Sequence, residues 1–298
     1  MKHKNILKWI LPALCVVVLS SCLKNKNEQP DFSSTAPTLE LPVNTPAGDG
    51  SPNTLSVSLP QLATPIDYFF YVNYAAADAN PTDVTVTLSV DLSVLERYNV
   101  AHPSDSLTQV PSSAYTMPLT VTIPAGQRKV QIPVKFASNL LNPDVSYGLP
   151  VTITDGAGVI ISKNFASVVV KVAVKNKYDG VYTMTGNVVR ENDNTGLNGP
   201  IVEGVTTNLV TDGANANGFT QYWANGGGIA GIDGTTLRVD PVTNKVTVFS
   251  KTNAALVNLP GFDNHYDPET RTFFLSFYWG NGPTHRAATV TLKFKGQR

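Results

Sequence analysis

Apolar and polar residues alternate with a period of two along most of the chain, and this pattern restricts the fold to β-sheet. Leu55, Val57 and Leu59 alternate with serines, and residues 84–90 and 130–136 repeat the pattern. Because neighbouring side chains on a strand point to opposite faces, each run predicts a strand with one buried face. The sequence therefore predicts an all-β protein whose strands are separated by turns.

The first half of the chain predicts a sandwich of two sheets. Seven or eight short strands are expected, beginning near Thr38, Leu55, Ile66, Val84, Thr116, Val130, Leu149 and Ala166. One short helix is expected at about Leu92–Tyr98, capped either by Asp91 or by a capping box of Ser93 and Glu96. This spacing of strands and turns is typical of a β-sandwich of immunoglobulin-like architecture. The cysteines of an antibody domain are missing, so only the architecture is predicted.

The second half predicts an antiparallel meander of about seven or eight strands. Residues 239–248 and 266–275 both carry Asp-Pro-x-Thr followed by an alternating strand. Asp before Pro favours a turn, so each segment is expected to form a hairpin corner. The last strand is expected to bury Ala288, Val290 and Leu292. Either a lipocalin-like barrel or a second sandwich satisfies this pattern.

The beginning of the chain carries an export signal. Lys2, Lys4 and other basic residues precede the apolar stretch 9–19, which ends in Leu19-Ser20-Ser21-Cys22. This is the order of a secretory signal peptide, and its end resembles a bacterial lipobox. The resemblance implies cleavage before Cys22 and lipidation of Cys22, so that the protein is anchored to a membrane. The alternative is an ordinary signal peptide with an incidental cysteine.

Composition then divides the chain into four segments. We expect a signal peptide (1–21), a lipidated Cys22 with a flexible tether (22–37), an immunoglobulin-like domain (38–176) and a carboxy-terminal barrel or sandwich (177–298). The tether contains few large apolar residues and cannot offset the entropy of ordering. The two cysteines of the chain both precede the tether, so no disulfide or thiolate metal site is expected in the folded part.

Five short motifs carry a family resemblance that covers about Leu39 to Lys175. They are Val84-Thr-Val-Thr-Leu-Ser-Val-Asp91, Arg97-Tyr-Asn99, Ser113-Ala-Tyr115, Ile123-Pro-Ala-Gly126 and Tyr147-Gly-Leu-Pro-Val151. This segment resembles the immunoglobulin-like amino-terminal domain, of unknown function, of Bacteroidetes cell-envelope lipoproteins. Residues 177–298 resemble the carboxy-terminal domains of the same group more loosely.

This resemblance implies a location and a class of partner. Many such lipoproteins belong to starch-utilisation-type (Sus-like) systems, in which outer-membrane lipoproteins capture glycans. It implies attachment to the outer membrane by a lipid anchor, with the exposed face left open. The implied partners are a polysaccharide or oligosaccharide and an outer-membrane transporter complex.

The sequence favours a non-catalytic protein without a cofactor. Its 22 basic and 22 acidic residues balance, and no basic cluster of the kind that binds nucleic acid is present. Histidines are scattered, and no nucleophile elbow, zinc-binding helix or phosphate loop occurs. A glycan hydrolase using Asp263, His265 and Asp267 is one alternative. A calcium site at Asp263, Asn264 and Asp267 is disfavoured because no ladder of ligands appears.

Two aromatic pairs are the candidate glycan-binding residues. Tyr222-Trp223 and Tyr278-Trp279 each run from a strand into a glycine-rich loop. Aromatic rings stack on the apolar faces of sugars, while polar side chains bond to the hydroxyl groups. The expected polar partners are Asn225, Asn281, His285 and Arg286. We expect one ring of each pair to be buried, since neighbours on a strand face opposite ways. The alternative is that these aromatic residues only pack in the sheet.

Two further interpretations depend on other features. Asp105-Ser106-Leu107 fits the short pattern at which exported proteins of this bacterial group are O-glycosylated, so Ser106 is a candidate modification site. A structural or adhesive lipoprotein that binds a protein partner suits the same two-domain architecture, because fold does not decide function.

Overall fold

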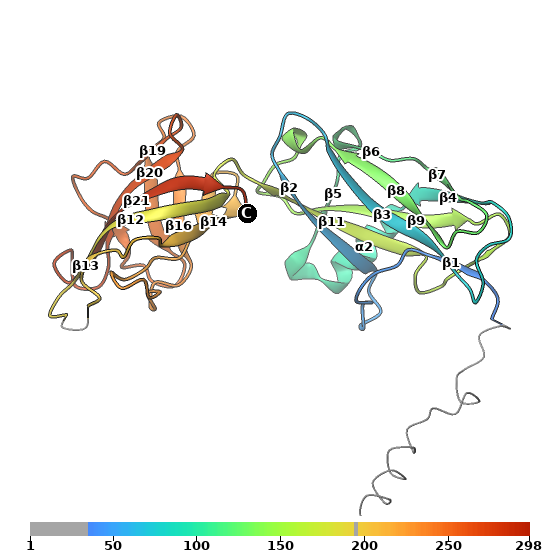
Figure 1. Cartoon of the computed structure of the whole chain (residues 1–298), viewed down its shortest axis with the longest axis horizontal. Coiled ribbons are helices and arrows are strands. Elements are labelled where there is room, and N and C mark those ends of the chain that lie inside the picture. Colours follow the sequence, from blue (N-terminus) through green and yellow to red (C-terminus); the bar gives the residue numbers. More distant parts are fainter. Residues whose placement is uncertain (1–34, 194–195) are drawn as a thin grey trace, which may run out of the picture.

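The protein is almost entirely β-sheet, arranged around two separate hydrophobic cores (Figure 1). This computed structural model describes residues 35–193 and 196–298. The signal, Cys22 and most of the expected tether lie outside the described residues. Within those two ranges, no helix is both long enough and apolar enough to cross a membrane. The prediction of an all-β fold with two domains is confirmed.

The first core lies between two sheets, as a sandwich requires. One sheet has the order β10-β1-β3-β8-β6, and the other β2-β11-β9-β4-β7, with β5 beside β9. The strands are β1 (Thr38–Glu40), β2 (Asn53–Pro60), β3 (Ile66–Ala75), β4 (Val84–Val90), β5 (Thr108–Gln109), β6 (Tyr115–Thr116), β7 (Thr120–Ile123), β8 (Lys129–Phe136), β9 (Tyr147–Asp155), β10 (Ile160–Ile161) and β11 (Ser167–Lys175). Valine, leucine and isoleucine at alternate positions fill the core.

One expected strand is divided in two. The continuous strand predicted over 116–123 is instead β6, which pairs with β8 in one sheet, and β7, which pairs with β4 in the other. Pro118 lies in the gap and has no backbone N–H to donate to a ladder. The chain therefore crosses between the sheets at this point, which a period-two pattern alone does not reveal.

The expected helix forms on the outer side of one sheet. It is α2 (Leu92–Ala101), and the side chain of Asp91 accepts a hydrogen bond from the Ser93 amide at 3.0 Å. Of the two expected caps, Asp91 is therefore the one used. Val94 and Leu95 are buried with Val169 of β11 in a small separate cluster. Three short 3₁₀ helices follow along the chain, at Pro103–Asp105, Ser112–Ala114 and Ser138–Leu140.

Substitution of the cap should weaken this helix measurably. We expect Asp91→Ala to lower the free energy of unfolding of the sandwich by about 1 kcal/mol, the usual cost of a lost N-cap. Urea unfolding followed by circular dichroism measures this loss. Asp91→Asn keeps an acceptor for the Ser93 amide and should recover most of the stability. A loss as large for Asp91→Asn as for Asp91→Ala would show that the cap is not the source of the effect.

The second core lies inside a single curled sheet of ten strands, a nearly closed barrel. Its main path runs β17-β16-β15-β14-β12-β21-β20-β18, with β13 beside β12 and β19 beside β20. The strands are β12 (Gly180–Arg190), β13 (Gly199–Pro200), β14 (Thr206–Gly213), β15 (Ala216–Gly218), β16 (Thr235–Val239), β17 (Val246–Ser250), β18 (Val257–Asn258), β19 (His265–Asp267), β20 (Thr272–Tyr278) and β21 (Arg286–Gly296). Of the two architectures left open by the sequence, the barrel is the one formed.

The barrel closes where β17 meets β18 and β19. The Asn258 side chain donates to Val246 O at 2.7 Å and accepts from the Val248 amide at 2.8 Å. The Val246 amide donates to Asn264 O, and Lys245 forms a bridge with His265. The Asn258 side chain and a few backbone bonds therefore join the two edges in place of a continuous ladder. Closure satisfies polar groups that an open edge would leave exposed.

Both Asp-Pro segments form the expected hairpin corners. Asp240 accepts hydrogen bonds from the amides of Val242 and Thr243 between β16 and β17. Asp267 accepts from the Glu269 amide and the Thr270 hydroxyl between β19 and β20. These side-chain bonds hold each turn in place, as expected for Asp at the first position.

The two bodies meet at a short segment between β11 and β12. The Asn176 side chain is buried and donates to Gly213 O, Ala216 O and Asn217 Oδ1 at 2.8–3.1 Å. Asp144 of the sandwich also accepts the Ala214 amide of the barrel at 2.6 Å. In Figure 1 the two bodies lie end to end along the long axis, and β12 runs from this junction to the far end of the barrel.

Candidate functional site

Three neighbouring strands, β12, β21 and β20, have ends at the free end of the barrel, away from the sandwich (Figure 1). Their end residues form a row there. Arg190 at the end of β12 lies opposite Arg286 at the start of β21. The Trp279 amide, just beyond β20, donates to Arg286 O at 3.0 Å, so this residue continues the row. Alternation gives all three the same face as the buried residues Val188, Ala288 and Phe277. The row therefore lies at the inner edge of the barrel mouth.

The two predicted aromatic segments meet at this end. The rings of Trp223 and Trp279 lie 5.9 Å apart between centroids at an angle of 43°. Trp223 and Tyr222 are half-buried and lie at the edge of the core. Tyr278 is also half-buried, but as the neighbour of Phe277 and Trp279 it faces the other side of the sheet. Trp279 is only 1% exposed and packs against Phe277 inside the core. A ring in that position cannot stack on a ligand at the surface, which corrects the expectation that Trp279 contacts glycan directly.

The loop after Trp223 is a closed turn. The Trp223 amide donates to Gly227 O at 2.7 Å, and the Gly226 amide donates back to Trp223 O at 2.9 Å. Gly226 has a φ of 84°, a left-handed conformation that favours glycine. The Asn225 side chain is exposed and accepts the Gly227 amide. The glycine-rich loop noted in the sequence is held by these bonds, which fix the position of the half-buried indole.

The second loop presents a histidine to the same rim. His285 Nδ1 lies 2.9 Å from Glu191 Oε2, and the Glu191 amide donates to His285 O. Gly280 has a φ of 74°, and a Cβ at this position would lie 3.0 Å from His285 Cδ2. The glycine therefore allows the imidazole to pack against the loop. Asn281 is exposed at the tip, with no hydrogen bond from its side chain to another residue described here.

Arg190 is a site residue that the sequence did not single out. Its guanidinium carbon lies 5.3 Å from the centroid of the Trp223 ring, a cation–π contact. Its Nη1 lies 3.8 Å from Asp193 Oδ1, and Asp193 also accepts the amides of Leu197 and Asn198. The sequence does contain a signal for this residue: one arginine, Arg190, ends a strand, and another, Arg286, begins the strand that pairs with it. Only the strand pairing shows that the two face each other.

The row offers donors and few acceptors. Arginine and the tryptophan N–H can only donate hydrogen bonds. Arg286 Nε and Trp279 Nε1 are buried and have no acceptor among the described residues. Among the described residues, no carboxylate lies within 4 Å of the Arg286 side chain. Oxygen atoms of a ligand that reached the outer nitrogens of Arg190 and Arg286 would meet donors from two strands.

The carboxylates of the alternative hydrolase site, Asp263 and Asp267, are both engaged in structural contacts. Asp263 forms an ion pair with Lys245, whose hydrogen bond holds the pKa of Asp263 below its usual value. A hydrogen bond from Thr270 likewise lowers the pKa of Asp267. A general acid needs a raised pKa, so these groups suit protonation of a leaving group poorly. Asn264 is buried and bonds through its side chain to the backbone of Ser276. Within 35–193 and 196–298, no three potential ligands gather around a metal position.

Ser106 is exposed, and its hydroxyl donates to Pro103 O at 3.1 Å. The residues beside it are fixed, because Asp105 contacts Lys171 and Tyr98 while Leu107 is buried. O-glycosylation of Ser106 stays a prediction.

Comparison with known proteins gives a family match in the first domain. A family model described as a "-like, N-terminal domain" matches residues 41–160. The match covers most of the segment in which the five motifs occur, and the resemblance inferred from them is confirmed there. No curated protein matches the sequence.

Several solved structures are similar at low sequence identity. A Bacteroides ovatus protein of unknown function is 13% identical, with a TM-score of 0.48 over 88% of this chain and 95% of its own. An auxiliary nutrient binding protein from Bacteroides thetaiotaomicron is 15% identical, with a TM-score of 0.43 over 82% and 91%. An endoglycosidase from the same species, solved with a Man5GlcNAc product, is 22% identical, with a TM-score of 0.34 over 40% and 28%.

Proposed function

We propose that this chain, whose residues 41–160 belong to that family of amino-terminal domains, is a non-catalytic lipoprotein that binds a polysaccharide or oligosaccharide. The binding site is the free end of the barrel. The observation that carries this proposal is the arrangement around Trp223: a half-buried indole fixed by its own turn, beside Arg190 and the exposed Asn225.

The rim has the two kinds of group that sugar recognition needs. The Trp223 ring, with Tyr222 next to it in the chain, supplies apolar faces for the C–H groups of a sugar ring. Asn225, Asn281, His285 and the two arginines supply hydrogen-bonding groups to the hydroxyls. Because the loops are already held by backbone bonds, binding costs little ordering entropy.

Retention of the protein on immobilised polysaccharides tests this function. The chain without its expected signal and Cys22, residues 23–298, should be retarded in native gels containing at least one polysaccharide of a broad panel. No new reducing ends should appear during the incubation. Release of reducing ends would show a hydrolase instead. If no polysaccharide retards the chain and a membrane extract yields a stable protein complex, the adhesive alternative is correct.

The lipid anchor is a proposal of its own, supported by the signal pattern that ends in Cys22. We expect Cys22→Ser to move the protein from the membrane fraction to the soluble fraction. Each buried CH₂ of an acyl chain contributes about 0.8 kcal/mol to membrane binding, so loss of the lipid should abolish stable attachment. Ultracentrifugation and detergent partitioning of wild type and variant measure this change. Ser21→Ala keeps the cysteine and should remain in the membrane fraction. A Cys22→Ser protein that still sediments with membranes would contradict the anchor.

A further inference from the structure

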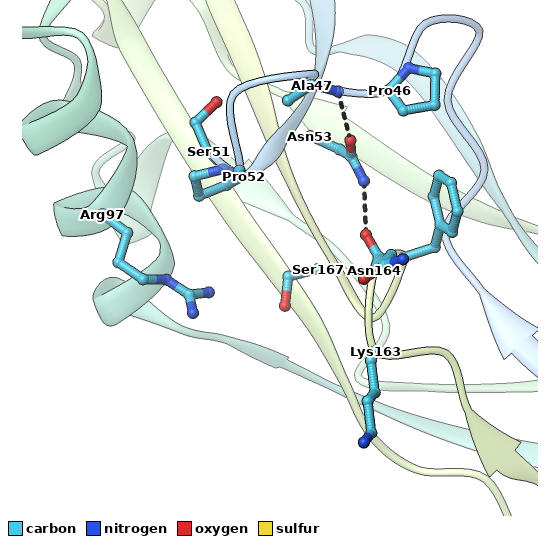
Figure 2. A pocket seen from close by; sticks show the side chains of 11 residues that line it. Pro46, Ala47, Ser51, Pro52, Asn53, Arg97, Lys163, Asn164 and Ser167 are labelled. Atoms are coloured by element: carbon cyan, nitrogen blue, oxygen red, sulfur yellow. Dashed lines mark hydrogen bonds between the residues drawn. The ribbon is translucent and has the colours of Figure 1, made fainter.

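A hollow of about 290 Å³ opens on the sandwich, far in sequence from the barrel mouth (Figure 2). Its walls are the loop 46–53 that leads into β2, the helix α2, and the turn 163–167 between β10 and β11. This volume is near the lower end of the range of small-molecule sites, about 300–1,000 Å³. Nothing in the proposed glycan site explains this hollow.

The walls are held together without a ligand. Asn53 is 6% exposed, accepts the Ala47 amide at 3.0 Å, and donates to Asn164 O at 2.9 Å. One buried side chain thus ties the loop to the turn, and Figure 2 shows both bonds. The opposite wall is fixed because α2 packs on β11 through its buried residues. The hollow is therefore preformed, which lowers the entropic cost of binding.

The two charged side chains that line the hollow are both positive. Arg97 extends from α2 and Lys163 from the turn, and the Ser167 hydroxyl lies between them in Figure 2. None of the lining residues is acidic. Two acids adjoin lining residues in the chain. Glu96, beside Arg97, is exposed on α2. Asp49, in the loop 46–53, accepts the Ser51 amide and lies 3.7 Å from His102 in the neighbouring groove.

Five of the ten lysines among residues 35–193 and 196–298 pair with a carboxylate, whereas the two cations of the hollow do not. Neither Arg97 nor Lys163 has a carboxylate within 4 Å among residues 35–193 and 196–298, and neither side chain forms a hydrogen bond there. The lysines that do pair with a carboxylate are Lys135, Lys171, Lys175, Lys245 and Lys251. Two unpaired cations at one preformed hollow raise the local potential for an anion.

We propose that this hollow binds a tetrahedral oxyanion, a phosphate or sulfate group, between Arg97 and Lys163. The guanidinium presents parallel N–H groups that match two oxygens of such a group, and the ammonium adds a compact charge. The Ser167 hydroxyl, 2.9 Å from Thr152 Oγ1, can bond to a further oxygen. Pro46, Pro52 and Phe165 line the remaining wall and can contact the apolar part of a ligand that carries the group.

Amide NMR of ¹⁵N-labelled residues 23–298 tests the site with inorganic phosphate and inorganic sulfate as probes. Ionic strength is held constant with sodium chloride. We expect saturable shifts at the amides of Asn53, Asn164 and Ser167. The double variant Arg97→Gln/Lys163→Gln should weaken binding at least about tenfold, because two charge-assisted contacts are lost. Lys129→Gln, an exposed lysine of β8 away from the hollow, should bind as wild type does.

The same titration shows which kind of molecule carries the phosphate or sulfate group that binds. Glucose 6-phosphate and glucose 6-sulfate that bind more tightly than the inorganic ions would indicate a sugar ester. Vesicles with phosphatidylglycerol that compete for the site, when phosphatidylcholine vesicles do not, would indicate a lipid headgroup. Shifts that rise linearly without saturation overturn the proposal. So does unchanged affinity in a double variant whose thermal unfolding matches that of wild type.

Discussion

Trp279→Ala is expected to destabilise the barrel by about 3–5 kcal/mol, the usual cost of deleting a large buried aromatic side chain. Trp279 is 1% exposed, and its ring lies 6.3 Å from Phe277 and 5.9 Å from Trp223 between centroids. Alanine would leave a cavity beneath the candidate site that these neighbours can fill only in part. Urea unfolding followed by far-ultraviolet circular dichroism measures the loss.

A matched variant at the same end of the barrel shows whether the loss of stability comes from the burial of Trp279 or only from its location. Trp223→Ala removes a half-buried ring from the same end of the barrel, so its cost should be clearly smaller. Trp279→Phe keeps a large apolar ring and should also lose less than alanine. Equal losses for Trp279→Ala and Trp223→Ala would contradict the assignment of Trp279 to the core and Trp223 to the rim.

For glycan binding we expect Trp223→Ala, rather than Trp279→Ala, to have the larger direct effect. Trp223→Ala should raise the Kd for an oligosaccharide by at least about tenfold, since a central aromatic contact typically contributes 1.4–2 kcal/mol or more. Arg190→Ala should also weaken binding, because its guanidinium lies over the Trp223 ring and faces the mouth. Isothermal titration with a fragment of the polysaccharide that retards the protein measures both changes.

Phe69 provides the control for this experiment. It is an aromatic residue of β3 that is 51% exposed on the sandwich and contacts Tyr71. Phe69→Ala removes a comparable exposed ring far from the barrel mouth and should leave the Kd unchanged. If Phe69→Ala weakens binding while Trp223→Ala does not, the site lies on the sandwich.

Local patterns in the sequence predict much of this fold. Alternating residues predicted strands such as β8 and β21, and Asp91 was one of the two caps predicted for α2, because these features depend on neighbours within a few residues. The Asp-Pro corners at Asp240 and Asp267 were predictable for the same reason. The division at Pro118 was not, since the choice between two sheets depends on distant partners.

The candidate site depended more on distant pairing. The sequence identified the pairs Tyr222-Trp223 and Tyr278-Trp279 but could not decide which ring of each pair was buried, because that depends on how the barrel closes. Closure uses Asn258, which bridges β17 and β18, together with backbone bonds between β17 and the segment that leads into β19, and no periodicity indicates these contacts. Arg190 became a site residue only through its register with Arg286.

Tryptophan fluorescence offers the most direct test of glycan binding at the barrel mouth. Residues 23–298 contain two tryptophans, Trp223 and Trp279. Trp279→Phe therefore leaves Trp223 as the single fluorophore at the proposed site. Titration of this variant with the polysaccharide that retards the wild type should change the Trp223 emission saturably, at the concentration that produces retardation. Retardation of the variant without any change in Trp223 emission would contradict the proposed site.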